Sequence, residues 1–261
     1  MIVLSYFAIV LMGVTLGLLG GGGSILTVPI LVYLFQLSAT VSTGYSLFLV
    51  GASALIGAYR YYQKGELNLK VGVIFAMPAF LGVYLVRGFI VSKLPEVIFS
   101  FQNFSLTKDS FILSVFAIVM LAAGISMIKG RTETKGDETK KINPMLVVLE
   151  GLVVGGITGF VGAGGGFLII PALVILAGLP MKEAVGTSLG IIAVKSLLGF
   201  IGDIQQNPNI DWSFLGLLLV FSILGIFIGD LLSKKVPAQR LKPAFGYFTL
   251  VMGIFLIYKQ F

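Results

Sequence analysis

The stretch 20–29, Gly-Gly-Gly-Gly-Ser-Ile-Leu-Thr-Val-Pro, decides the fold, and the stretch 162–171, Gly-Ala-Gly-Gly-Gly-Phe-Leu-Ile-Ile-Pro, repeats its pattern. Each glycine cluster interrupts an apolar run that is too long for one membrane span of about 20 residues. Consecutive glycines cost a helix interior about 1 kcal/mol each, so the helix should break there. A broken backbone at membrane depth is tolerated only where protein or water satisfies its amides. We therefore predict two glycine-broken helices that face a cavity near the middle of the membrane.

The composition places the chain among membrane proteins. It has 261 residues, of which 57% are hydrophobic and 11% are charged, whereas about 25% of residues are charged in a soluble domain. This excludes a soluble enzyme, a nucleic-acid binder and a disordered protein, and it predicts an all-α polytopic protein in the lipid bilayer. The chain has neither Cys nor His, which removes the commonest metal ligands and the usual general base near neutral pH. We expect no cofactor, no metal and no enzymatic activity.

The chain contains an internal repeat at an offset of 142 residues. Residues 13–57 align without gaps to residues 155–199 with sixteen identities, where composition alone predicts about four. The match continues with a one-residue slip, which aligns Leu81-Gly82 with Leu224-Gly225. We predict a first transmembrane repeat over 1–130, a polar cytoplasmic linker over 131–142 and a second transmembrane repeat over 143–261.

Each half is expected to contain five helical segments, the second of them short. In the first half the segments are 3–19, 24–36, 43–60, 71–92 and 110–128. In the second half they are 144–161, 166–177, 184–202, 213–232 and 243–259. The stretches between them, 93–109 among them, are expected to be loops.

Five is an odd number, so the second half should lie inverted relative to the first, as in many secondary transporters. The positive charges support this topology. If the linker is cytoplasmic, thirteen Lys and Arg residues lie inside, and four lie outside, namely Arg87, Lys93, Lys108 and Lys259. We therefore predict a multi-pass protein of the cytoplasmic membrane with both termini outside.

The short segments that begin at Ser24 and Gly166 should point free N–H groups and positive dipole ends into the cavity. Two such ends suit a small anion, and glycine lets a substrate approach the backbone. The alternative is that the glycines only allow helices to pack closely. Packing needs one small residue per turn, so it accounts better for Gly13 and Gly17, with Gly155 and Gly159, than for the clusters.

Hydroxyl groups lie at equal offsets after the two breaks. They belong to Thr43 and Ser46 in the first half and to Thr187 and Ser188 in the second. These side chains could coordinate a ligand in the same cavity, or they could simply cap the next helix.

Three charged residues are expected inside or beside the apolar segments. Lys195 lies near mid-membrane, where a charge is expensive and marks a functional site by default. The alternatives for Lys195 are an ion pair with an acid such as Glu150, or snorkelling toward water. Glu150 is the acid most clearly inside a segment and is the candidate proton carrier. Asp230 is expected to form a helix-surface ion pair with Lys234.

The repeated motif Gly-x-Gly-Gly-Gly/Ser-x4-Pro, followed by Gly186-Thr187-Ser188-Leu189 in the second half, resembles the TauE/SafE family of sulfite exporters. This family is also called the toluene sulfonate uptake permease family, and the resemblance covers nearly the whole chain. It implies import or export of a small sulfur-containing anion such as sulfite, thiosulfate, sulfoacetate or another sulfonate, coupled to an ion gradient. The first half departs from the motif, because Ser24 replaces a glycine and Gly44-Tyr45-Ser46 replaces Gly-Thr-Ser.

The expected function is therefore secondary transport of a small anion by alternating access, with one half rocking against the other around the breaks. A passive anion channel and a non-catalytic membrane subunit are the alternatives. The expected substrate-binding residues are Gly20, Gly22, Gly23, Ser24, Thr43, Ser46, Gly162, Gly164, Gly165, Gly166, Thr187, Ser188 and Lys195. Pro29 and Pro171 are expected to break or hinge the helices, and Glu150 is expected to couple protons. The exact substrate, the transport direction and the oligomeric state, a homo-oligomer included, are left open.

Overall fold

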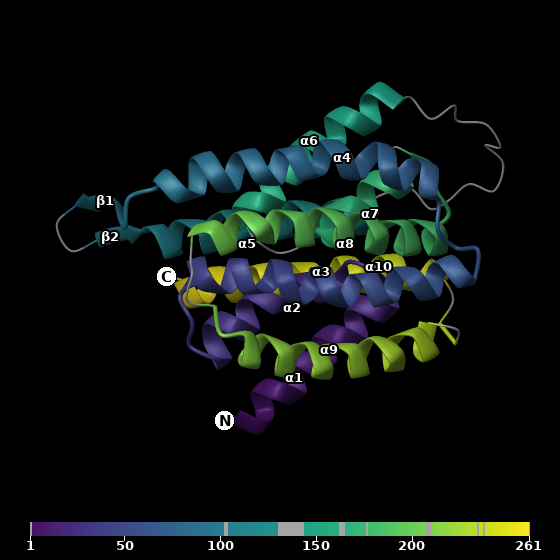
Figure 1. Cartoon of the computed structure of the whole chain (residues 1–261), viewed down its shortest axis with the longest axis horizontal. Helices are drawn as coiled ribbons and strands as arrows, with labels where there is room; N and C mark the ends of the chain where they lie inside the picture. The colour runs from purple at the N-terminus through teal and green to yellow at the C-terminus, as the bar shows by residue number, and fades with distance from the viewer. Residues whose placement is uncertain are drawn as a thin grey trace.

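The computed structural model describes residues 2–101, 104–129, 144–161, 165–175, 177–206, 210–233, 235–236 and 238–260. Within these ranges the chain is almost entirely helical (Figure 1). The first half contains α1 (Ile2–Leu19), α2 (Gly22–Pro29), α3 (Ala39–Gln63), α4 (Leu69–Leu85) and α5 (Lys108–Lys129). The second half contains α6 (Pro144–Val161), α7 (Gly166–Ile175), α8 (Met181–Gln206), α9 (Trp212–Ser233) and α10 (Ala238–Gln260). The predicted linker 131–142 lies outside the described residues.

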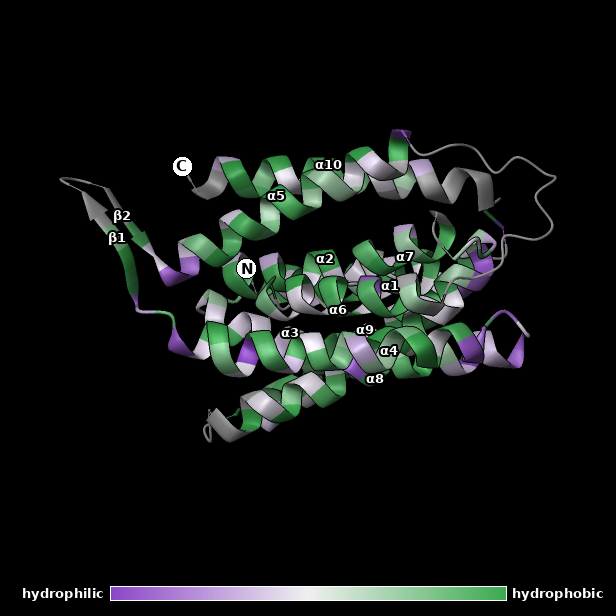
Figure 2. Ribbon diagram, turned by 90° about the horizontal axis from the view of Figure 1, so that it is seen from above, coloured by the Kyte–Doolittle hydropathy of each residue, from purple (hydrophilic) through white to green (hydrophobic). Residues whose placement is uncertain are grey.

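These helices confirm the predicted all-α polytopic fold. Among the described residues, five helices are long and apolar enough to cross a membrane, namely Ala39–Gln63, Leu69–Lys93, Lys108–Ser126, Met181–Gly202 and Trp212–Ser233. Four shorter apolar helices accompany them, at Val3–Leu19, Gly23–Leu34, Val147–Val161 and Gly246–Tyr258. Figure 2 shows hydrophobic residues along the helices and hydrophilic residues gathered mainly toward the ends of the bundle.

The helices of the two halves interlock. The most extensive contacts join α1 to α9, α4 to α6, α3 to α8 and α5 to α10, and every one of these pairs takes one helix from each half. By the repeat, α6 is the equivalent of α1 and α4 is the equivalent of α9, so the α4–α6 pair is the counterpart of the α1–α9 pair. A two-fold relation between the halves would give this pattern of contacts.

Equivalent helices that touch run in opposite directions. In the contact of α3 with its equivalent α8, Gly51 lies against Leu197 and Gly57 lies against Leu189, so the two helices are antiparallel. If the two halves were related by a two-fold axis parallel to the helices, α3 and its equivalent α8 would run in the same direction. Inverted repeats would give the antiparallel arrangement of α3 and α8 that these contacts show. The first and last helices bring both chain ends to the same end of the bundle, opposite the turn between α3 and α4 (Figure 1).

Glycines make the interlocked helix pairs unusually close. A Cβ added to Gly155 would lie 2.1 Å from the carbonyl oxygen of Ala79, and a Cβ added to Gly13 would lie 2.2 Å from that of Ser222. Gly159 and Gly17 make equivalent approaches to Val83 and Ile226. Helix packing therefore accounts for these four glycines.

The prediction of a loop over 93–109 is wrong for part of its length. Strands β1 (Val97–Phe101) and β2 (Phe104–Thr107) pair in an antiparallel hairpin there, with an irregular register between Val97 and Phe99. The aromatic and β-branched residues of this stretch favour strand structure. The sequence prediction considered only the apolar helical segments on either side of this stretch and did not use its strand-forming residues.

The surface position predicted for Asp230 is also wrong. Its side chain is buried, and its partners in the described part of the chain are Arg60 and Lys64 of α3. Lys234 lies outside the described residues. Spacing along one helix could not reveal these partners, because they come from the other half of the chain.

The Gly155 contact makes a testable prediction. Gly155→Ala should lower the thermal unfolding temperature, since overpacking a tight contact costs about 1–3 kcal/mol. Gly216→Ala is the matched control, because Gly216 is a helical glycine with nothing within 4 Å of an added Cβ. The control should leave stability unchanged or raise it by up to about 1 kcal/mol. Equal unfolding temperatures for the two variants would contradict the close α4–α6 packing.

Candidate functional site

The two helix breaks meet inside the bundle. A Cβ added to Gly21 would lie 2.2 Å from the carbonyl carbon of Gly166, and one added to Gly166 would lie 2.3 Å from the Cα of Gly21. These two residues stand at the N-termini of α2 and α7, so the positive ends of both helices approach the same point. The structure therefore brings together the two glycine clusters that the sequence singled out.

The first break bends at Gly20, whose φ is +69°. A Cβ on Gly20 would lie 3.0 Å from Ser188 Oγ, so the first break lies against the hydroxyl motif of the second half. Ser24 is buried, and its Oγ donates to the carbonyl oxygen of Gly21 at 2.7 Å. The Ser24 hydroxyl thus stabilises the break itself. Gly22 and Gly23 form the first turn of α2.

The second break surrounds Gly165, whose φ is +71°. A Cβ on Gly165 would lie 2.0 Å from Thr158 Cγ2 and 2.7 Å from Lys195 Nζ. Gly162 and Gly164, which precede it, lie outside the described residues. The Lys195 ammonium therefore lies directly beside the backbone of this break, at a point where only glycine fits.

Lys195 is completely buried, and its Nζ donates to Thr158 Oγ1 at 2.6 Å. Thr158 in turn donates to the carbonyl oxygen of Gly155 at 3.2 Å. Among the residues that the structure describes, no carboxylate lies within ion-pair distance of Lys195. The ion pair with Glu150 is therefore not formed, and complete burial excludes snorkelling. A buried ammonium whose described partners are neutral, next to two helix N-termini, attracts anions.

The other predicted hydroxyl groups have different surroundings. Ser188 Oγ donates to the carbonyl oxygen of Val185 at 2.8 Å, and Thr187 Oγ1 accepts from the Asn68 N–H at 2.9 Å. Thr43 Oγ1 donates to the Thr40 carbonyl oxygen at 2.8 Å. The Ser46 hydroxyl is buried without a hydrogen-bond partner in the described structure.

These hydroxyl groups do not cap helices. The N-cap of α3 is Ser38, whose Oγ accepts from the Val41 N–H at 3.3 Å, and Thr43 and Ser46 lie one to two turns further along. Thr187 and Ser188 are likewise inside α8, which begins at Met181. The capping alternative is therefore wrong for all four residues.

Sequence reasoning missed Arg87 and Thr158. Arg87 was placed among the outside cations, but only 5% of it is exposed. Its Nη1 donates to the Gly159 carbonyl oxygen at 3.3 Å and its Nη2 donates to Thr43 Oγ1 at 3.2 Å. Because Gly159 follows Thr158, the two buried cations Arg87 and Lys195 bind neighbouring residues of α6. The position of Arg87 inside the predicted segment 71–92 was the signal that could have identified it.

The remaining predicted site residues lie further from the breaks. Pro29 ends α2 and is followed directly by a π-helical turn, Ile30–Leu34, while Pro171 lies inside α7. The helical backbone thus continues past both prolines. Glu150 is half-buried on α6, about two turns before Thr158, and it forms no hydrogen bond or ion pair with the described residues.

Comparison with known proteins identifies relatives over nearly the full length. The family model described as sulfite exporter TauE/SafE matches residues 5–256. A probable membrane transporter protein of Xylella fastidiosa (strain 9a5c) is 29% identical over 256 residues, which cover 96% of this chain and 92% of the relative. The probable membrane transporter protein MJ0441 of Methanocaldococcus jannaschii is 28% identical over 95% of this chain and 94% of its own length. The probable membrane transporter protein YdhB of Bacillus subtilis is 27% identical over 95% of this chain and 97% of its own length. No solved structure matches.

A substitution at the second break can distinguish the effect of a steric clash from the effect of backbone strain. Gly165→Ala should abolish anion binding, because the new methyl group would displace Thr158 and the Lys195 ammonium. Gly178→Ala is the matched control, since Gly178 has a φ of +68° and nothing within 4 Å of an added Cβ. Both variants carry the strain of a left-handed alanine, about 1–2 kcal/mol. Binding of thiosulfate by isothermal titration should be lost only in Gly165→Ala, and equal binding by both variants would refute the site.

Proposed function

Because the chain belongs to the sulfite exporter TauE/SafE family, we propose that it is a secondary transporter of a small sulfur-containing anion. Sulfite, thiosulfate, sulfoacetate or another sulfonate is the proposed substrate, and alternating access is the proposed mechanism. The family and the relatives described as probable membrane transporter proteins support the general assignment. They fit a protein without enzymatic activity.

One observation carries the proposal for an anion. Lys195 is fully buried, its partner among the described residues is a hydroxyl group rather than a carboxylate, and it lies beside the second glycine break. Burying an unpaired charge is costly unless a ligand or a cavity compensates it. The N-termini of α2 and α7 add two positive dipole ends at the same place. A bound oxyanion would compensate all three.

The proposed mechanism differs from rocking of sequence halves. The two most extensive helix contacts in the described structure join α1 to α9 and α4 to α6, both rest on close-packed glycines, and each pair bridges the halves. Moving one sequence half against the other would therefore separate the two most extensive helix contacts among the described residues. We propose that the interlocked pairs move as units around the glycine breaks.

The proposed location is the cytoplasmic membrane, with both termini outside. The turn between α3 and α4, with Lys64 and Lys70, lies at the end of the bundle opposite the chain ends (Figure 1). Positively charged residues are enriched on cytoplasmic loops, which supports placing that turn inside.

Substitution of Lys195 tests the proposed substrate site. Lys195→Met keeps the approximate volume and removes the charge, so the fold should survive. Binding should weaken about 10- to 100-fold, which corresponds to the about 1.5–3 kcal/mol of a hydrogen bond to a charged group. Binding and uptake should be measured in proteoliposomes with sulfite, thiosulfate, sulfoacetate, sulfate and lactate. Lys70→Met, at an exposed lysine, is the control and should behave like the parent.

The same vesicles distinguish a transporter from a channel. Accumulation of anion above its own gradient when an ion gradient is imposed supports secondary transport. Retained anion affinity in Lys195→Met would refute the direct role of this lysine, and binding of none of the five anions would refute the proposed substrate class.

We further propose that Glu150 carries a coupled proton, since it is a half-buried carboxylate without a described partner on the helix that carries Thr158. Glu150→Gln cannot release a proton, so uptake should lose its dependence on an imposed pH gradient. Glu96→Gln, at an exposed acid in the turn before β1, should keep that dependence. A pH dependence in Glu150→Gln that matches the parent would exclude this residue as the carrier.

A further inference from the structure

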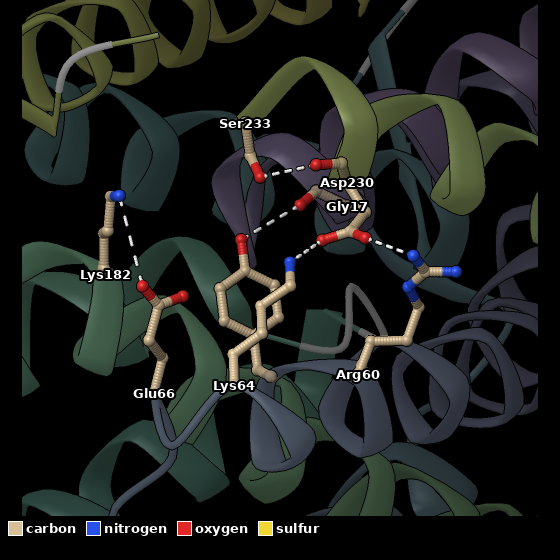
Figure 3. A network of polar contacts seen from close by, with 8 residues as sticks. Gly17, Arg60, Lys64, Glu66, Lys182, Asp230 and Ser233 are labelled. Atoms are coloured by element: carbon tan, nitrogen blue, oxygen red, sulfur yellow. Dashed lines mark hydrogen bonds and ion pairs between the residues drawn. The ribbon is translucent and has the colours of Figure 1, made fainter. Parts of the chain in front are cut away.

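A cluster of charged residues joins α3 to α9 at the end of the bundle that carries Lys64 (Figure 3). Asp230 of α9 is only 1% exposed. Its Oδ2 lies 2.6 Å from Arg60 Nη2, and its Oδ1 accepts from Lys64 Nζ. The Arg60 guanidinium also lies 4.8 Å from the ring centroid of Phe227 on α9. A buried carboxylate of this kind depends on its cations, because removing one partner leaves an uncompensated buried charge.

The same turn of α3 also binds α1. The hydroxyl group of Tyr61 donates to the Gly17 carbonyl oxygen at 3.3 Å (Figure 3). Gly17 packs closely on α9, where a Cβ would lie 3.2 Å from the Asp230 backbone nitrogen. The pair formed by α1 and α9 is thus tied as one unit to the last turns of α3. Gly17 precedes the first break at Gly20 by less than one helical turn.

The contact of α3 with α9 is the looser of two equivalent contacts. Its repeat counterpart, the contact of α8 with α4, is more extensive. Along the α3–α9 contact, the partners change from an aromatic pair, Tyr45 and Phe214, through a hydrogen bond between Ser53 and Ser222 at 2.7 Å, to the charged cluster. Polar contacts therefore hold this seam at the end where α3 meets α4.

The turn after α3 extends these contacts to the first turns of α8. The N–H of Asn68 donates to Thr187 Oγ1 at 2.9 Å, and its Nδ2 donates to Glu183 Oε1 at 2.9 Å. Glu66 lies 4.0 Å from Lys182 in a more exposed ion pair (Figure 3). The turn that follows Lys64 thus binds Thr187, the neighbour in sequence of Ser188, which borders the first break.

We propose that Arg60, Lys64 and Asp230, with Tyr61, form an ionic latch that closes the anion site from the end of the bundle that carries Lys64. When the latch opens, the α1–α9 pair swings away from α3 around the glycine break and exposes the site on that face. Glycine permits the backbone change that such a hinge requires. The inference rests on the proposed transport function and assigns the gate of that same site.

The absence of Cys from the chain makes the latch measurable. Val185 is 1% exposed and borders the first break, since a Cβ on Gly20 would lie 2.8 Å from Val185 Cγ1. Val185→Cys should react slowly with a membrane-impermeant maleimide applied to either face of membrane vesicles. Adding Asp230→Asn should accelerate labelling roughly tenfold, and only from the face that carries Lys64, because the open state gains population. Asp230→Glu should restore slow labelling.

Two further variants guard this experiment. Lys182→Gln breaks the Glu66 pair, whose side chains are 52% and 32% exposed, and should leave labelling unchanged. Lys64→Gln keeps Arg60 as a partner of Asp230, so it should fold even if Asp230→Asn does not. Its labelling should be faster than in the parent with Val185→Cys alone and slower than with Asp230→Asn. Unchanged labelling in folded Asp230→Asn, or faster labelling from both faces, would overturn the latch. No substrate is present, so failure of the anion assignment in the binding assay would leave this result intact.

Discussion

Backbone amides inside an apolar bundle require partners, and the meeting of the two glycine breaks is where this chain satisfies that requirement. Gly21 and Gly166 approach so closely that neither position can carry a Cβ. Local hydrogen bonds satisfy part of the backbone at the two breaks. Ser24 Oγ donates to the Gly21 carbonyl oxygen, and the N–H groups of Leu168 and Ile169 donate to the Gly165 carbonyl oxygen. The first N–H groups of α2 and α7 have no partner within their own helices. Both short helices must therefore point inward, and the long helices surround them.

The same preference for glycine determines which helices pack most closely. Close backbone contacts in a membrane protein depend on small residues, because lipid tails are as apolar as the side chains and provide little driving force for helix association. Here these contacts link α1 with α9 and α4 with α6, across the halves. The helix pairs that we propose to move as units are therefore not the two repeats of the sequence. The helices joined most tightly are far apart in the sequence, and the glycine breaks lie at the ends of α1 and α6, where such units connect to the short helices.

Local chemistry was sufficient to predict the helices and the breaks. Apolar runs, Gly clusters and the repeat predicted ten segments, and the central position of Lys195 followed from its distance into one of them. The sequence could not reveal which polar groups meet, because Lys195 binds Thr158 and Arg87 binds Gly159 across large sequence separations. The partners of Asp230 could not be predicted from the sequence for the same reason. Its near neighbour Lys234 suggested a local pair, whereas its described partners lie on α3. Ser24 was expected to bind substrate, and the sequence did not reveal that its hydroxyl donates to the Gly21 carbonyl oxygen within the break.

Polar residues break the symmetry that the backbone preserves. The repeat counterpart of Lys195 is Ser53, which hydrogen bonds to Ser222, and the counterpart of Arg87, after the one-residue slip, is Asp230. An anion moving between the two ends would therefore meet a buried cation near one end and a buried carboxylate near the other. A lone carboxylate would repel it. Arg60 and Lys64 give two positive charges against the single negative charge of Asp230, so the cluster presents a net positive charge to the anion. A latch built from one acid and two bases can thus close the path without opposing the substrate.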